Sequence, residues 1–126
     1  MNESLIIGTR LVVFALLFYS IGIFTEQRKK HATNVVLIFI TLGLVTDITA
    51  TIFMIIGSDN SAFTLHGLLG YSSLLAMLID AILLWRFRIK QGVETEVTKG
   101  LHKYCRYAYT WWLLAFITGA LLVFLK

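Results

Sequence analysis

The sequence contains no proline and only one cysteine, Cys105. Without proline, nothing in the sequence forces a kink in a helix. A single cysteine excludes an intramolecular disulfide and every CxxC-type metal or haem-attachment motif. Any cofactor must therefore be held by other residues.

Charged residues are also scarce. Only 14% of the 126 residues are charged and 58% are hydrophobic, and the mean hydropathy is +0.81, whereas about a quarter of a soluble domain is charged. The charges are clustered, which leaves apolar runs that a small water-soluble core could not enclose. The first run has no basic n-region within Met1–Ile7 and no small-residue cleavage pattern after Phe24, so it is predicted to be a membrane span and not a signal peptide. We therefore expect an integral membrane protein.

Each of four apolar segments approaches the roughly 20 residues that a helix needs to cross the hydrocarbon core of a membrane. They cover residues 5–24, 34–56, 64–85 and 104–125. Because backbone groups in lipid must be hydrogen-bonded internally, these segments are expected to be helices. The connections are short, so residues 1–126 are predicted to form a single all-α transmembrane domain, a membrane-embedded four-helix bundle with up-down-up-down topology. The first helix should then lie diagonally opposite the third, and the second opposite the fourth.

Lysine and arginine orient the predicted bundle. The first loop reads TEQRKKHAT and the third reads RFRIKQGVETEVTKGLHK, whereas the second loop, GSDNSAF, has no basic residue. By the positive-inside rule, the two basic loops should face the cytoplasm and both termini the outside. The chain is thus expected to be a multi-pass protein of the cell membrane. Its net charge is +4, but no nucleic-acid-binding motif accompanies this charge, so no nucleic-acid partner is expected.

Three ionisable residues lie inside the predicted spans: Arg10, Asp47 and Asp80. A charge at membrane depth is costly and usually faces the bundle interior or a partner. Arg10 is long enough to bridge to Asp47, either as an interior ion pair or as part of a cofactor site or proton path. Alternatively, Arg10 extends along the helix to the membrane surface.

The third segment has the clearest helical pattern. At 100° per residue, one line along the helix is polar or small at nearly every turn, and it holds His66, Gly70, Ser73, Met77, Asp80 and Leu84. This line should face the interior, where Gly70 would leave room for a planar ring one turn from His66. The second segment carries a similar line that ends at Met54, whose thioether could be a second iron ligand or a gap-filling core residue.

All three histidines stand where a predicted span begins: His31, His66 and His102. Neutral imidazole is a common ligand of haem iron. His31 and His102 begin diagonal helices on the cytoplasmic side and could share one haem, although His31 lies about 160° around its helix from Asp47 and so off the polar line. His66 lies at the opposite membrane face and cannot share a haem with either. The sequence therefore permits an outer haem site, an inner site or both, alongside the alternative that these are interfacial or hydrogen-bonded histidines.

Basic residues surround the inner pair of histidines. Lys29, Lys30, Lys103 and Arg106 could neutralise haem propionates through charge-assisted hydrogen bonds, or could simply belong to the positive-inside cluster. GxSxG, HExxH and P-loop motifs are absent. Enzymatic activity is therefore not predicted.

Three stretches carry a family resemblance: TLHGLLGYSSLLAMLIDAILLW, RKKHATNVVLIFITLGLVTDITATIFM and LHKYCRYAYTWWLLAFITGALL. Over essentially its whole length the chain resembles the small bacterial haem-sensing membrane proteins, often called HsmA-like. The resemblance implies a four-span protein of Gram-positive bacteria that binds haem b, is controlled by a haem-responsive regulator, and protects against haem toxicity and oxidative stress by holding the cofactor. It does not assign the axial ligands. A weaker resemblance is to the two-haem, ascorbate-reducing cytochromes b, which use four histidines where this chain has three.

Three functions follow as hypotheses. The first is a membrane protein that sequesters one or two haem b groups. The second is a b-type cytochrome that passes electrons within or across the membrane to a quinone or another redox partner. The third is a haem-free transporter or channel subunit in which Arg10, Asp47 and Asp80 line a polar path. Small residues such as Gly43 and Gly119 would allow close helix packing within one bundle or in a homo-oligomer.

Overall fold

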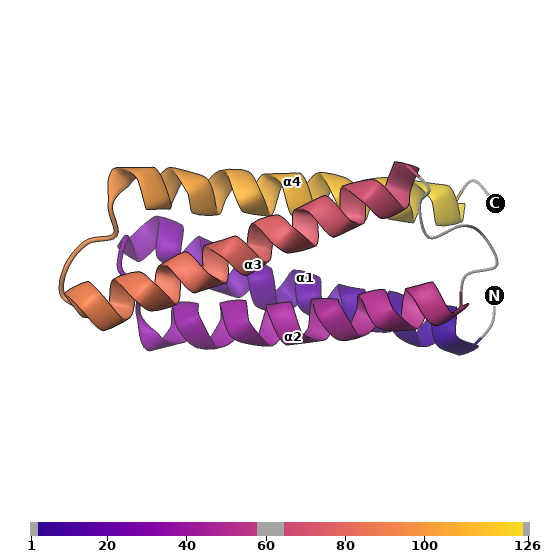
Figure 1. The fold of residues 1–126 in the computed structure, drawn as a ribbon, viewed down its shortest axis with the longest axis horizontal. Coiled ribbons are helices and arrows are strands. Elements are labelled where there is room, and N and C mark those ends of the chain that lie inside the picture. Colours follow the sequence, from indigo (N-terminus) through magenta and orange to yellow (C-terminus); the bar gives the residue numbers. More distant parts are fainter. Residues whose placement is uncertain (1–2, 58–64, 125–126) are drawn as a thin grey trace.

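The computed structural model describes residues 3–57 and 65–124, and these residues form helices without strands. The four helices are α1 (Glu3–Lys29), α2 (Asn34–Gly57), α3 (Leu65–Gln91) and α4 (Lys99–Phe124). They lie side by side, and each runs antiparallel to its neighbour in the chain (Figure 1). The predicted all-α, up-down-up-down four-helix bundle is confirmed.

Three helices are longer than the apolar segments that predicted them. α1 continues past Phe24 to Lys29, α3 continues past Trp85 to Gln91, and α4 begins at Lys99, ahead of Tyr104. Long polar side chains favour a helix and can reach water from its last turns, so the apolar boundary does not end the helix. The first and third loops are correspondingly shorter than the sequence suggested.

Residues with positive φ end two of these helices. Lys30 has a φ of 58° and Gly92 a φ of 81°, and their amides donate to the carbonyls of Glu26 and Arg88 at 2.7 and 2.9 Å. This is the left-handed residue that commonly follows a helix C-terminus. Glycine adopts it without strain, whereas lysine does so at a cost.

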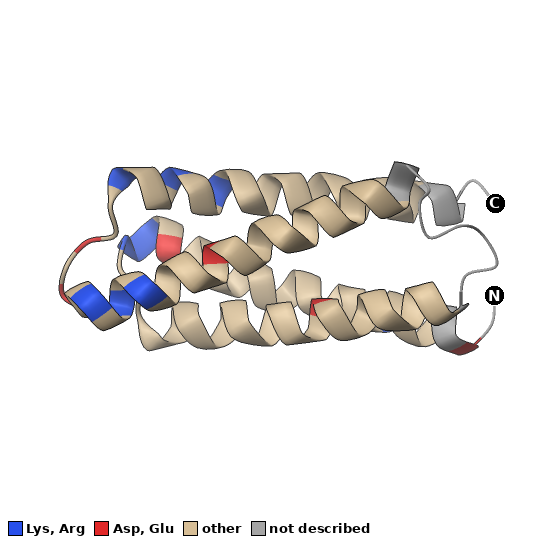
Figure 2. Ribbon diagram, in the orientation of Figure 1, with Lys and Arg blue, Asp and Glu red and all other residues tan. Residues whose placement is uncertain are grey.

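The first and third loops are joined by hydrogen bonds at one end of the bundle. The amide of Val97 donates to the carbonyl of Lys30 at 2.7 Å, the guanidinium of Arg88 donates to the carbonyl of Ala32 at 3.0 Å, and Nδ1 of His31 lies 2.8 Å from the carbonyl oxygen of Val93. Apart from Arg10, the described Lys and Arg residues gather at this end (Figure 2). We call it the basic end, and the opposite end, which holds Gly8, Met54 and Gly70, the far end.

Packing within the bundle is uneven. α1 packs closely along α2 and α3 along α4, while α1 with α4 and α2 with α3 close the ring. The predicted diagonal arrangement of α1 with α3 and of α2 with α4 is therefore confirmed. α1 and α2 approach each other closely at glycines: a Cβ on Gly22 would lie 2.9 Å from Ile40, and one on Gly43 would lie 2.5 Å from Cδ1 of Tyr19.

Gly43→Ala is expected to lower the free energy of unfolding by about 2 kcal/mol, because the added methyl would overpack a well-ordered core. Tyr19 cannot easily move aside, since its hydroxyl is hydrogen-bonded to Asp47. Gly70→Ala is the matched control: a Cβ there would meet nothing within 4 Å, and alanine favours the helix by up to about 1 kcal/mol. Thermal unfolding of both variants in detergent measures the difference. Equal stability of the two would mean that α1 and α2 pack less closely than described.

Three of the described helices are long and apolar enough to cross a membrane, over Ile6–Lys29, Asn34–Ile56 and Gly67–Gln91. Their outward faces carry large exposed apolar side chains, such as Ile52 and Leu75. A chain with these features is a membrane protein. The fourth predicted span, residues 104–125, ends outside the described residues, and the first turns of α4 carry basic residues.

Candidate functional site

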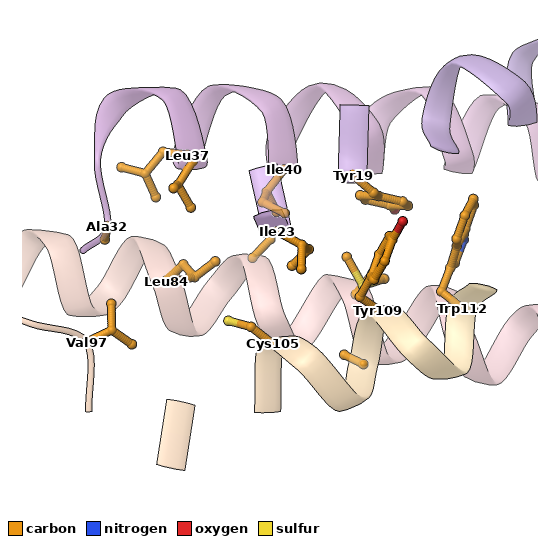
Figure 3. Packing of buried hydrophobic residues seen from close by; sticks show 14 of the residues in the cluster. Tyr19, Ile23, Ala32, Leu37, Ile40, Leu84, Val97, Cys105, Tyr109 and Trp112 are labelled. Atoms are coloured by element: carbon orange, nitrogen blue, oxygen red, sulfur yellow. The ribbon is translucent and has the colours of Figure 1, made fainter. Parts of the chain in front are cut away.

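The hydrophobic core fills the bundle from the basic end to its middle. At the basic end it consists of Ala32, Leu84 and Val97, and in the middle it includes Tyr19 and Trp112 (Figure 3). Beyond the middle the burial falls away: no side chain of residues 67–72 in α3 or 116–121 in α4 is buried. The interior is therefore closely packed from the basic end to the middle and less buried toward the far end.

Four polar side chains are buried in the described part of the bundle: Glu26, Asp47, Ser73 and Asp80. The sequence pattern had singled out both aspartates and Ser73. Glu26 was missed because the run TEQRKKHAT reads as a polar loop, whereas α1 continues through it. Its position relative to Tyr19 and Ile23, at helical spacings of four and then three residues, places it on the buried face of α1 and was the available signal.

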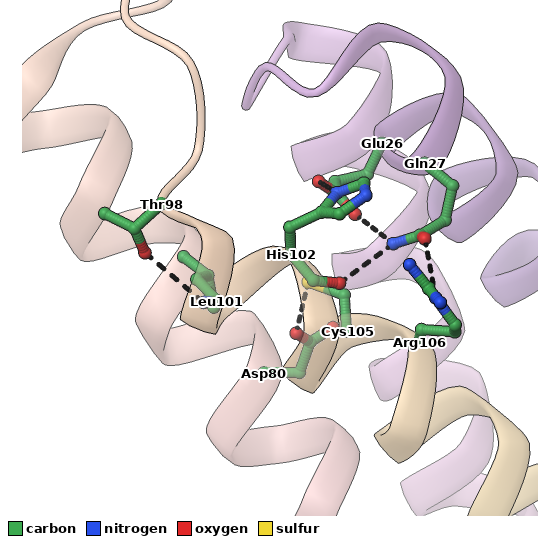
Figure 4. A network of polar contacts seen from close by, with 8 residues as sticks. All are labelled: Glu26, Gln27, Asp80, Thr98, Leu101, His102, Cys105 and Arg106. Carbon is green, nitrogen blue, oxygen red and sulfur yellow. Dashed lines mark hydrogen bonds and ion pairs between the residues drawn. The ribbon is translucent and has the colours of Figure 1, made fainter.

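Glu26 is bonded to one of the three histidines. Its Oε2 lies 2.8 Å from Nδ1 of His102, whose side chain is 17% exposed, whereas Glu26 is fully buried. The other carboxylate oxygen accepts from Nε2 of Gln27 at 2.6 Å, and Nε of Arg106 donates to Gln27 at 3.2 Å (Figure 4). These contacts fix the orientation of the imidazole between α1 and α4.

Asp80 lies on α3 next to the single cysteine. The thiol of Cys105 donates to Oδ1 of Asp80 at 2.8 Å (Figure 4). The second oxygen, Oδ2, is buried and has no hydrogen-bond partner among the described residues. A buried oxygen without a partner is costly, so this carboxyl group is a candidate for a functional role.

Asp47 of α2 is hydrogen-bonded to side chains of α1 and α4, and not to Arg10 as predicted. Its Oδ2 accepts from the hydroxyl of Tyr19 at 3.0 Å and from Nε1 of Trp112 at 2.8 Å. The expected bridge from Arg10 is not formed, and the Arg10 side chain is exposed. The physical reason is helix geometry: Arg10 and Tyr19 are separated by about two and a half turns, so they point to opposite sides of α1.

The structure also describes the other residues that were predicted for the inner haem site. His31 is half-buried in the loop before α2, and the predicted propionate partners Lys30 and Lys103 are exposed at the basic end, as is Arg106. Ala32, Val97 and their core neighbours fill the interior at this end (Figure 3). The Nδ1 atoms of His31 and His102 lie 2.8 Å from the carbonyl oxygen of Val93 and 2.8 Å from Oε2 of Glu26. Haem ligation by this inner pair stays a prediction.

The far end holds the remaining candidates. The side chain of His66 lies outside the described residues, but its position in α3 is described. Ser73, Met77, Asp80 and Leu84 from its predicted line are all buried, which confirms that the part of this line from Ser73 to Leu84 faces inward. Gly70 is half-buried.

Space is available beside Gly70. A Cβ on this residue would meet nothing within 4 Å, and α3 diverges from α2 toward the far end (Figure 1). Met54 lies on the other side of the bundle: its Cγ is 2.8 Å from where a Cβ on Gly8 would stand, so it packs against α1. Gly70, one of the residues predicted to hold haem, therefore has open space beside it.

Comparison of the chain with protein-family models, with characterised proteins and with solved structures gave no match in any of the three. The described residues contain no group of three or more His, Cys, Asp or Glu arranged to hold a metal ion. The proposals below therefore rest on the geometry of this chain.

Proposed function

We propose that this protein binds haem b at the far end of its bundle, with His66 as an axial ligand. By holding haem it would limit haem toxicity and the oxidative stress that haem causes. The observation that carries the proposal is the inward line of α3, which is buried at Ser73, Met77 and Asp80 and reaches open space at Gly70. Bound haem would supply iron that is reducible and ligated by imidazole.

The far end of the bundle suits a largely apolar ring. Phe116, Gly119 and Ala120 of α4 are half-buried there, so part of their surface is open to a ligand, and burying it would be favourable. The proposed bundle has four spans, with both basic loops in the cytoplasm and both termini outside. The haem would then lie near the outer surface of the membrane.

The proposal is tested by titrating haem into the protein purified in detergent. We expect a shifted Soret band, a reducible b-type spectrum and saturation near one haem per chain. Absence of a spectral shift would contradict haem binding. Saturation at two would point to a second site.

Gly70→Leu is expected to weaken haem binding without unfolding the bundle. The leucine would occupy the open space beside the ring, and a steric conflict of about 1–3 kcal/mol corresponds to roughly a 5- to 150-fold loss of affinity. Haem titration measures the affinity, and thermal unfolding of the haem-free variant provides the control. Unchanged affinity would place the ring elsewhere.

A second candidate function is proton transfer by a haem-free protein. The observation that favours it is the burial of three carboxylates on three helices: Glu26, Asp47 and Asp80. Ionisable groups inside a membrane bundle often form proton pathways. Proton flux into liposomes that is lost in Asp80→Asn, by a protein that binds no haem, would favour this function. Transfer of electrons across the membrane would need two haems, or one haem and a quinone.

A further inference from the structure

A cavity of about 660 Å³ lies between α3 and α4 at the basic end. The apolar part of its wall includes Leu83, Phe87 and Leu101. Two cations of α3, Arg86 and Lys90, also line it. The volume falls in the range of about 300–1,000 Å³ that is typical of ligand pockets. The cavity shares no residue with the proposed haem site.

The two cations are free to bind an anion. Arg86 and Lys90 are exposed, and in the described part of the chain neither is paired with a carboxylate. They lie four residues apart on α3 and so on one face of it. Glu96 also lines the cavity but lies beyond ion-pair distance of both.

A smaller cavity of about 310 Å³ lies between α2 and α3 and provides a contrast. Its one cation, Arg88, already donates to the carbonyl of Ala32 at 3.0 Å. Of these two cavities, the one between α3 and α4 therefore combines an apolar wall with unpaired cations.

The position of the cavity indicates which anion would enter it. It lies at the end of the apolar stretch Gly67–Gln91 of α3, where Ile89 is still 77% exposed. In the proposed topology, this end of α3 lies at the depth where lipid headgroups meet hydrocarbon. Basic pockets between helices on the cytoplasmic side of a membrane bind anionic lipid headgroups.

We propose that this cavity binds an anionic phospholipid, with Arg86 and Lys90 contacting the phosphate and Leu83 and Phe87 contacting the first part of an acyl chain. A soluble anion would use the two cations and leave the apolar wall exposed to water. A phospholipid would contact both the cations and the apolar wall. Its phosphate would lie at the cations, and its acyl chains would lie along the wall.

The test measures binding of phosphatidylglycerol to the full-length protein in detergent by native mass spectrometry. Arg86→Gln combined with Lys90→Gln is expected to weaken binding about 30-fold, since each interfacial cation contributes roughly fivefold. Glu96→Gln removes the acidic residue of the cavity and is expected to strengthen binding. All three residues are exposed, so these changes should leave the core intact.

Controls separate this site from general attraction to a basic surface. Arg28→Gln with Lys29→Gln removes two exposed cations at the same end but outside the cavity, and should retain most of the affinity. Equal losses in the two double variants would overturn the proposal, as would equal binding of phosphatidylcholine. Equally tight binding of glycerol 3-phosphate, which lacks acyl chains, would assign the site to a soluble anion and would also overturn it.

Discussion

Replacing His66 with alanine is expected to abolish the Soret shift that haem produces in the wild-type protein. Loss of an axial ligand should cost more than the 10- to 100-fold that is typical when only a hydrogen-bond partner of a ligand is removed, so we expect a loss of affinity of at least about 100-fold. The measurement is a haem titration followed by absorbance. The reduced b-type spectrum should disappear in the same variant.

Variants of the other two histidines provide the matched comparison. His31→Ala should bind haem like the wild type, because His31 lies in a loop where its Nδ1 is 2.8 Å from the carbonyl of Val93. His102→Asn, whose amide can still donate to Glu26, should also retain binding. If either variant loses haem while His66→Ala keeps it, the site lies at the basic end and the present assignment is wrong.

His102→Ala is expected to lower the free energy of unfolding by about 3 kcal/mol, because it leaves a buried carboxylate without its partner. Glu26 is fully buried, and its Oε2 is 2.8 Å from the His102 imidazole. Thermal or denaturant unfolding in detergent, without haem, gives the magnitude. This should be the largest effect on stability among the variants considered.

A double variant separates loss of the carboxylate's partner from loss of packing. If the unpaired carboxylate is the cause, Glu26→Gln should recover part of the stability lost in His102→Ala, because the amide is less costly to bury. His102→Asn should be milder than His102→Ala for the same reason. Equal destabilisation by Asn and Ala would show that the ring's packing matters more than its hydrogen bond.

Much of the fold could be predicted because hydrophobic segments long enough to span a membrane permit few arrangements. The four helices, their order and the inward line through Ser73, Met77 and Asp80 follow from apolar length and a 3.6-residue period. The boundaries were less predictable. Apolar length reports where lipid ends, whereas hydrogen bonding and a residue with positive φ, such as Gly92, decide where a helix ends.

The candidate site was predicted less completely. Asp47 and Asp80 were found as charges within apolar runs, but their partners were not, because Tyr19, Cys105 and Trp112 come from other helices and no local pattern identifies them. Glu26 was hidden in a run of polar residues. Pairing depends on the rotation of each helix about its axis, which the sequence of a single segment constrains only weakly.

The hydrogen bonds between the first and third loops have a consequence for the motion of the bundle. They tie the α1–α2 hairpin to the α3–α4 hairpin at the basic end, through Val97 with Lys30 and Arg88 with Ala32. If the hairpins separate, they should pivot about these bonds, and α2 and α3 should move apart most at the opposite end. Such a motion would widen the far end while Glu26 and Asp80, which are buried, stay enclosed.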